Sequence, residues 1–197
     1  MKKLAFALVC GTALLAGCAR TAPPPPPPLP PAPVDLNNPL MAPGFLAQAA
    51  SSNEFEIESS QLALQMSQNP AVRNFANMMI ADHSRLGQAM AAAATSAGLT
   101  PPAPTLLPQH QALLDQLRST GPNFDAAYRG VQIQGHQQAL TLFQNYAASG
   151  DVPAIRTAAS QAIPAIQMHL SQAQMLSVAP PPPPPPPPPI RRSGERG

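Results

Sequence analysis

Apolar side chains recur every three to four residues along four long stretches of the chain, which is the period of an α-helix with one buried face. The stretches run over about residues 44–68, 70–97 and 123–149, and from 153 to beyond 173. Each is longer than an average helix, and glycine or proline stands at most of the boundaries. The pattern predicts an all-α protein built as a four-helix bundle.

Residues with strong end preferences flank these stretches. Asn69 and Pro70 suit the N-cap and the first position of the second helix, and Gly98 suits its C-terminal end. We expect Asn123 to cap the third helix and Asp151 to cap the fourth.

The helical period also predicts which side chains face the core. The first helix presents one stripe of Phe55, Leu62 and Met66 and a second apolar face of Leu46, Ile57 and Leu64. For the other three helices, the expected inward residues are Val72, Phe75, Ala76, Met79, Leu86 and Met90; Phe124, Tyr128, Val131, Leu142 and Tyr146; and Ile155, Ala159, Ala162, Ile166 and Ala173.

The connection between the second and third helices is long. It covers residues 99–122, starts with several prolines, and contains a short helical pattern over 109–118. Two helical hairpins joined by one long crossover are the connectivity of ferritin-like bundles, whereas up-and-down bundles use short loops. We therefore predict a ferritin-like bundle.

Proline dominates both ends of the chain. Of 29 prolines, nine lie within Pro23–Pro33 and ten form the run Pro180–Pro189. Such runs lack backbone donors and adopt stiff polyproline II spacers, so we expect disordered flanks around the bundle. The predicted organisation is a signal over 1–17, a spacer over 18–43, the helical domain over 44–178 and a tail over 179–197.

The N-terminus has the features of an export signal. Lys2 and Lys3 precede an apolar stretch over Leu4–Leu15, too short for a permanent membrane span. The following Leu15-Ala16-Gly17-Cys18 resembles the lipobox of bacterial lipoproteins, which implies that Cys18 carries lipid such as palmitate. With Ala19 rather than aspartate next, we expect an outer-membrane anchor and a domain in the periplasm or at the cell surface.

Signal removal changes the charge. The full chain has a formal charge of +2, but loss of both lysines leaves nine arginines against nine acidic residues. No basic surface for nucleic acid is expected. The predicted partners are the membrane, through Cys18, and an envelope protein or cell-wall component.

Three histidines occur one per helix: His83, His136 and His169. His83 lies within the apolar stripe of its helix, whereas His136 and His169 lie beside theirs. Glu56 and His83 are each about 14 residues from the turn near Asn69, so they share a level along the bundle. His169 is 19 residues beyond Gly150, which places it roughly 8 Å from the level of His136.

These residues are candidate ligands for iron, zinc or another transition metal. We consider a mononuclear site of Glu56, His83 and His136, with His169 as a weaker member. The alternative is that each histidine only hydrogen-bonds a neighbour and fixes helix register.

Catalytic patterns are incomplete. A ferritin-like di-iron site needs glutamate three residues before histidine, but Ile80, Ile133 and Ile166 stand there. The sequence also lacks a phosphate-binding glycine loop and a nucleophile elbow. We expect no catalytic residues and no enzyme, and we expect Asp82 to lie at the surface rather than to orient His83.

A spaced set of residues over 45–176 resembles the bacterial domain-of-unknown-function 4142 family. The set comprises Phe55-Glu56-Ile57, Leu62-Ala63, Phe75-Ala76, Met79, Asp82-His83, Phe124-Asp125, Tyr128, His136, Ile163-Pro164 and His169-Leu170. The resemblance implies a ferritin-like, exported protein with characteristic positions Glu56, Asp82, His83, Asp125, Tyr128, His136 and His169. It implies no established activity, and we expect structural roles for Asp82, Asp125 and Tyr128.

Two functions follow as hypotheses. The leading one is a non-enzymatic, lipid-anchored envelope protein with a structural or interaction role. The alternative is a metal-binding or redox bundle in the periplasm.

Overall fold

The computed structural model describes residues 35–178. The signal, Cys18 and both proline runs lie outside these residues. The described part contains α1 (Ala42–Met66), α2 (Pro70–Ser96), α3 (Pro108–Arg118), a 3₁₀ turn (Gly121–Asn123), α4 (Phe124–Ser149) and α5 (Pro153–Met175). Among these helices, none combines the length and hydropathy that crossing a bilayer requires.

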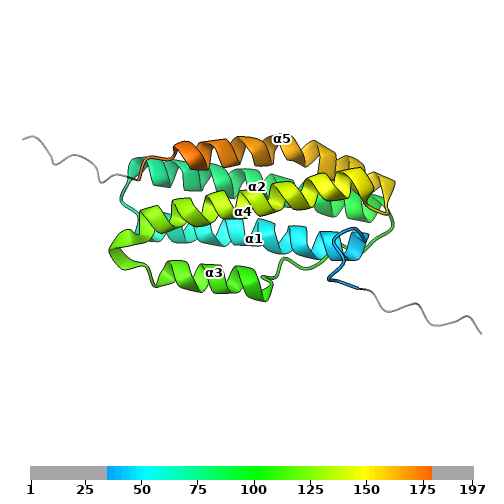
Figure 1. Ribbon diagram of the computed structural model, residues 1–197, viewed down its shortest axis with the longest axis horizontal. Helices are drawn as coiled ribbons and strands as arrows, with labels where there is room; N and C mark the ends of the chain where they lie inside the picture. The colour runs from blue at the N-terminus through cyan, green and yellow to red at the C-terminus, as the bar shows by residue number, and fades with distance from the viewer. Residues whose placement is uncertain (1–34, 179–197) are drawn as a thin grey trace, which may run out of the picture. The chain divides into compact units, whose positions relative to one another are not determined.

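Four long helices form the predicted all-α bundle (Figure 1). The pairs α1/α2 and α4/α5 are antiparallel hairpins, and α1 also packs on α4 while α2 packs on α5. The long connection predicted between the second and third long helices is present. It carries α3, which packs against α1 and α4 outside the four-helix arrangement.

The helix ends of the first hairpin follow the local sequence. The Asn69 side chain accepts a hydrogen bond from the amide of Ala71, as an N-cap does. Gly98 adopts φ +73°, a left-handed conformation that side chains disfavour, and α2 ends just before it. Asn123, by contrast, makes no side-chain cap bond to α4. The predicted N-cap position of Asn123 is confirmed, but the expected side-chain bond is absent, and the 3₁₀ turn leads directly into the helix.

Asp151 caps a different helix from the one expected. Its Oδ1 accepts hydrogen bonds from the amide of Ala42, 2.8 Å away at the start of α1, and from the Tyr146 hydroxyl at 2.8 Å. The N-cap of α5 is Val152, which makes no side-chain cap bond. The turn between α4 and α5 therefore stabilises the N-terminus of α1, 109 residues away in sequence.

The inward faces agree with the predicted stripes for α2 and α5 and shift slightly in α1 and α4. Met66 is 43% exposed rather than inward, because it lies in the last turn of α1. In α4, Gln132 and Phe143 are fully buried, whereas Val131 and Leu142 are only half-buried. One residue corresponds to about 100° of rotation, so this small difference turns a polar Gln132 into the core.

The core consists of two apolar clusters along the bundle. One contains Phe45, Phe143, Tyr146 and Ile166, and the other contains Phe55, Met79, Phe124 and Tyr128, each with further residues. Between them the helices place six side chains that are mostly buried and all polar, which we call the polar layer: Asn53, Glu56, His83, Gln132, His136 and His169. A polar layer in mid-bundle is where helical bundles carry metals and cofactors.

Candidate metal centre

His83, His136 and His169 come together in the polar layer from α2, α4 and α5. All three are buried, with exposures of 4%, 1% and 0%. Their ring centroids are 5.2 to 5.6 Å apart, and one ring nitrogen of each lies within 4.8 Å of one from each of the others. The helical angles indicated an inward His83; the structure buries the other two equally.

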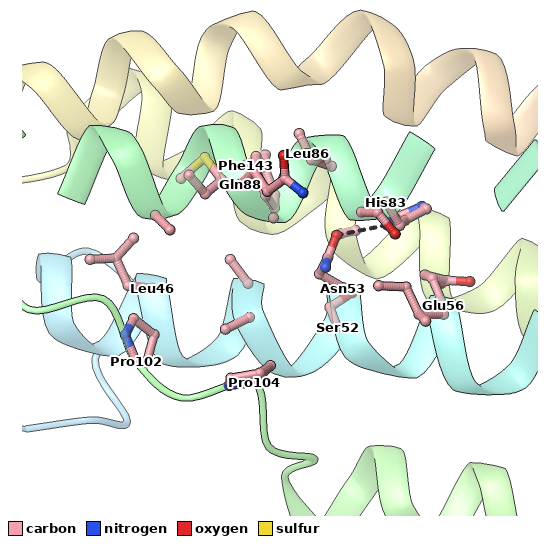
Figure 2. Close-up of a pocket in the computed structure, with 18 of the residues that line it drawn as sticks. Leu46, Ser52, Asn53, Glu56, His83, Leu86, Gln88, Pro102, Pro104 and Phe143 are labelled. Atoms are coloured by element: carbon pink, nitrogen blue, oxygen red, sulfur yellow. Dashed lines mark hydrogen bonds between the residues drawn. The ribbon is translucent and has the colours of Figure 1, made fainter. Parts of the chain in front are cut away.

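His83 is held by a side chain of α1. Its Nδ1 donates a hydrogen bond to Asn53 Oδ1 at 3.1 Å, as Figure 2 shows. Asn53 has room beside α2 because Gly87 faces it: a Cβ at Gly87 would lie 2.9 Å from Asn53 Nδ2. Asn53 was not among the predicted site residues, although a glycine inside a helical pattern, such as Gly87, can mark a close packing contact.

The other two histidines are held in the same way. His136 Nδ1 donates to the Gln132 carbonyl oxygen of its own helix at 2.7 Å. His169 Nε2 donates to Asp82 Oδ2 on α2 at 3.0 Å. An imidazole that donates through one nitrogen carries its lone pair on the other, so these bonds select the tautomer of each ring.

The nitrogens that carry the lone pairs have no hydrogen-bond partner within residues 35–178. They are His83 Nε2, His136 Nε2 and His169 Nδ1. Buried polar atoms are normally satisfied, so three orphaned acceptors in one cluster call for a missing partner. Metal-binding histidines show this arrangement, with one nitrogen on the metal and the other on a protein oxygen.

Burial also keeps two of the imidazoles in the form that binds metal. Desolvation lowers the pKa of His83 well below its usual value, and the neighbouring His136 and His169 lower it further. Desolvation lowers the pKa of His136 to about 4, against the opposing effect of its bond to Gln132. Both rings are therefore neutral at pH 7, and a cation need not displace a proton from them.

Glu56 lies beside this cluster on α1. It is 1% exposed, and its Oε1 is 3.6 Å from His136 Nδ1. Burial raises the pKa of Glu56 to about 8, against the opposing effect of the nearby Gln132 side chain. No group in the described part of the chain meets either carboxyl oxygen in full hydrogen-bond geometry. Gly135 makes room for the carboxyl group, since a Cβ there would lie 2.7 Å from Glu56 Oε1.

The expected axial offset of His169 was wrong. Counting from Gly150 ignored the extended residues of the turn: His136 lies 13 residues before Ser149, and His169 lies 16 residues after Pro153. The two counts differ by three residues, which corresponds to about 4.5 Å of helix rise. A small axial offset between α4 and α5, together with the length of the side chains, can bridge that distance. His169 thus joins the cluster as a full member.

We expected Asp82 to lie at the surface and not to orient His83. It makes no hydrogen bond to His83 within the described residues, but it is a partner of His169. One oxygen pairs with Arg85 and the other accepts from His169. Tyr128 pairs with Ser60 at 2.8 Å, and Asp125 is half-buried in the first turn of α4, so both contribute to the fold as expected.

The fourth histidine belongs to another environment. His110 on α3 shares a hydrogen bond with Ser51 Oγ at 2.6 Å and stacks on Phe55 at 5.6 Å between ring centroids. It joins α3 to α1 and takes no part in the cluster.

The donor set fits a transition-metal ion. Neutral imidazoles suit zinc, copper, iron and nickel, and ligands about 2.0 to 2.1 Å from a tetrahedral ion are roughly 3.4 Å apart. One nitrogen of each ring lies within 4.8 Å of one from each of the others, so small side-chain movements bring three nitrogens to that spacing. Three protein ligands leave one coordination position open, and the carboxyl groups of Glu56 and Asp82 can balance the charge of the ion.

Comparison with known proteins agrees with this architecture. Among curated proteins, none matches the chain. Among solved structures, the fold is similar to CopM in the Cu(II)-bound form, with a TM-score of 0.56 and 21% sequence identity over 68% of this chain and 94% of that one. A family model described as a domain of unknown function, DUF4142, matches residues 28–176. Because that match covers most of the sequence, the chain belongs to the DUF4142 family.

Proposed function

We propose that this protein binds a single transition-metal ion through His83, His136 and His169. The observation that carries the proposal is the hydrogen bonding of the three rings: each uses one nitrogen on a protein oxygen and leaves the other, buried and unpartnered within residues 35–178, to the cluster. This arrangement favours the metal-binding hypothesis over histidines that only fix helix register, which would need no orphaned nitrogens.

Copper(II) is the first candidate ion and zinc the second. The order of metal affinities at nitrogen sites places copper highest among the divalent first-row ions. The Cu(II)-bound form of CopM, whose fold is similar, gives modest support. The missing Glu-x-x-His motifs argue against a di-iron centre.

The test is metal binding by the full chain purified without affinity metal. We expect one equivalent of Cu(II) or Zn(II) by mass spectrometry after dialysis, and a rise in melting temperature with added metal. His83→Ala should abolish both effects. His110→Ala is the matched control, since it removes a largely buried histidine outside the cluster and should leave the stoichiometry at one.

An unchanged melting temperature in all added metals, with no metal retained, would remove the proposal. Equal retention by wild type and His83→Ala would instead place the metal elsewhere in the chain.

We further propose that the protein acts in the cell envelope as a lipoprotein anchored through Cys18. The support is the charged and apolar start of the sequence, followed by the cysteine. Labelling with a palmitate analogue should mark the wild type and leave Cys18→Ser unlabelled. Outer-membrane fractionation then tests the location, and an unlabelled wild type contradicts the anchor.

A further inference from the structure

A cavity of about 280 Å³ adjoins the polar layer. Its walls come from α1, α2, α4 and α5 and from the connection between α2 and α3 (Figure 2). Most of the wall is apolar, with Leu46, Leu86, Met90, Phe143 and Ile166 as its large side chains. For comparison, an apolar cavity of about 150 Å³ in a protein core holds a benzene molecule. This cavity has room for an aromatic ring with a short side arm.

The outer wall is built from prolines. Pro101, Pro102 and Pro104 line the cavity from the connection, where the chain has no helical structure before α3. Proline has no backbone N–H, so these residues present rings and not donors to the interior. The outer wall therefore adds apolar surface.

The charged chemistry of the cavity is confined to one end. Glu56 is the acidic residue that lines it, no lysine or arginine of the described chain is among the lining residues, and His83 and His136 stand beside Glu56. Both Glu56 oxygens are buried, and no group among residues 35–178 meets them in full hydrogen-bond geometry, although the nearby Gln132 side chain lowers the pKa of Glu56. The proposed metal ligands are the three histidines, so these oxygens are available to another partner. An occupant with a donor group at one end would satisfy them.

We propose that this cavity binds a small molecule with an apolar body and one hydrogen-bond-donating head, an amine or an alcohol, whose head bonds to Glu56. The apolar walls select the body and the carboxyl group selects the head. An anionic head is disfavoured, because no lysine or arginine of residues 35–178 lines the cavity to pair with its charge. The inference does not depend on a metal and goes beyond the proposed metal site.

The test uses four probes with the same phenyl body: 2-phenylethylamine, 2-phenylethanol, ethylbenzene and 3-phenylpropionate. Binding to the full, metal-free chain is measured by titration calorimetry. We expect saturable one-to-one binding of the amine and the alcohol, about fivefold weaker binding of ethylbenzene for want of one hydrogen bond, and no binding of the carboxylate.

Two variants separate the head from the body. Glu56→Leu removes the acceptor at similar volume and should weaken the amine and the alcohol about fivefold, through loss of one hydrogen bond, and leave ethylbenzene unchanged. Ala50→Leu, at a lining position, should abolish binding of all probes, whereas Ala148→Leu, at an exposed position of α4, should not.

Several outcomes would overturn the inference. Absence of saturable binding in the wild type would show that the cavity is not a ligand site. Equal affinity for all four probes, or amine binding insensitive to Glu56→Leu, would show that Glu56 does not select the head. Metal stoichiometry is measured separately, so failure here leaves the proposed metal site intact.

Discussion

The three clustered histidines depend on the groups that hold their outer nitrogens. Asn53, the Gln132 carbonyl and Asp82 each accept one hydrogen bond from a ring. These bonds hold the rings and fix their tautomers before any ion arrives, which reduces the reorganisation that binding requires. Asp82 differs from the other two because it is a carboxylate and also pairs with Arg85 at the surface.

Asp82→Asn tests this role in positioning His169. Loss of the carboxylate should weaken metal affinity about 10- to 100-fold, because the ring becomes less basic and less well oriented. The affinity is measured by competition with a chelator of known strength. Arg85→Ala is the control: it removes the exposed partner of Asp82, leaves the bond to His169, and should change the affinity little.

Stability of the metal-free variant separates a positioning role from a purely structural one. We expect Asp82→Asn to shift the metal affinity far more than the melting temperature. A large fall in melting temperature with unchanged metal affinity would show that Asp82 only supports the fold.

At the scale of elements, polar contacts between distant segments set how the helices pair. Asp151, in the turn between α4 and α5, accepts from the first amide of α1, a type of cap that contributes about 1 kcal/mol to stability. Arg73 near the start of α2 donates to the carbonyls of Leu64 and Ser67 at the end of α1. These contacts tie the ends of three helices together, so the polar layer is assembled at mid-bundle from elements whose offsets are defined.

Glycines at two positions let polar side chains cross between helices. Gly87 on α2 faces Asn53, and Gly135 on α4 faces Glu56. Glycine within a helix costs stability, roughly 0.5–1 kcal/mol relative to alanine. Here that cost accompanies two close approaches that a methyl group would obstruct.

For the whole molecule, the polar layer divides one bundle into two apolar clusters and makes its stability depend on pH. Burial lowers the pKa of His83 and of His110. It also lowers the pKa of His136, to about 4. A histidine with a lowered folded pKa contributes stability above its unfolded value near 6.5, which is lost as the pH falls. The contribution of Glu56 to stability has the opposite pH dependence, because burial raises its pKa in the folded state to about 8. This contribution is present below the pKa of Glu56 in the unfolded chain and is lost as the pH rises.

The metal-free protein should therefore be most stable near pH 6.5. Below that value the histidines reduce stability, and between about 6.5 and 8 Glu56 reduces it by up to about 1.4 kcal/mol per pH unit. Melting temperatures from pH 5 to 8.5 in a chelator test this. Glu56→Gln should remove the loss on the alkaline side and keep the loss in acid.

The melting temperatures of the wild type and of Glu56→Gln are compared between pH 6.5 and 8. If the wild type does not fall relative to the variant, Glu56 is not the source of the loss of stability on the alkaline side. A profile of Glu56→Gln that stays flat below pH 6.5 would contradict the contribution of the histidines, because in the wild type Glu56 opposes them there.

Local signals in the sequence were enough to predict the helices of this protein. Helical period, Asn69 with Pro70, and Gly98 are local signals, and they predicted the α2 boundaries and the long connection that carries α3. The inward position of His83 also followed from its own stripe, and Glu56, His83, His136 and His169 could all be named as candidate ligands. These properties depend on residues close together in the chain, which is why pattern reasoning reached them.

The contacts between these residues depend on how the helices pack against one another. The level of His169 depended on the extended turn and the offset between α4 and α5, which a residue count does not contain. The partners Asn53 and Asp82 lie 30 and 87 residues from the histidines they hold, and Asp151 caps a helix 109 residues away. Such contacts arise from packing of separate helices, because helix rotation and axial offset are set by all the side chains between them and not by any one segment.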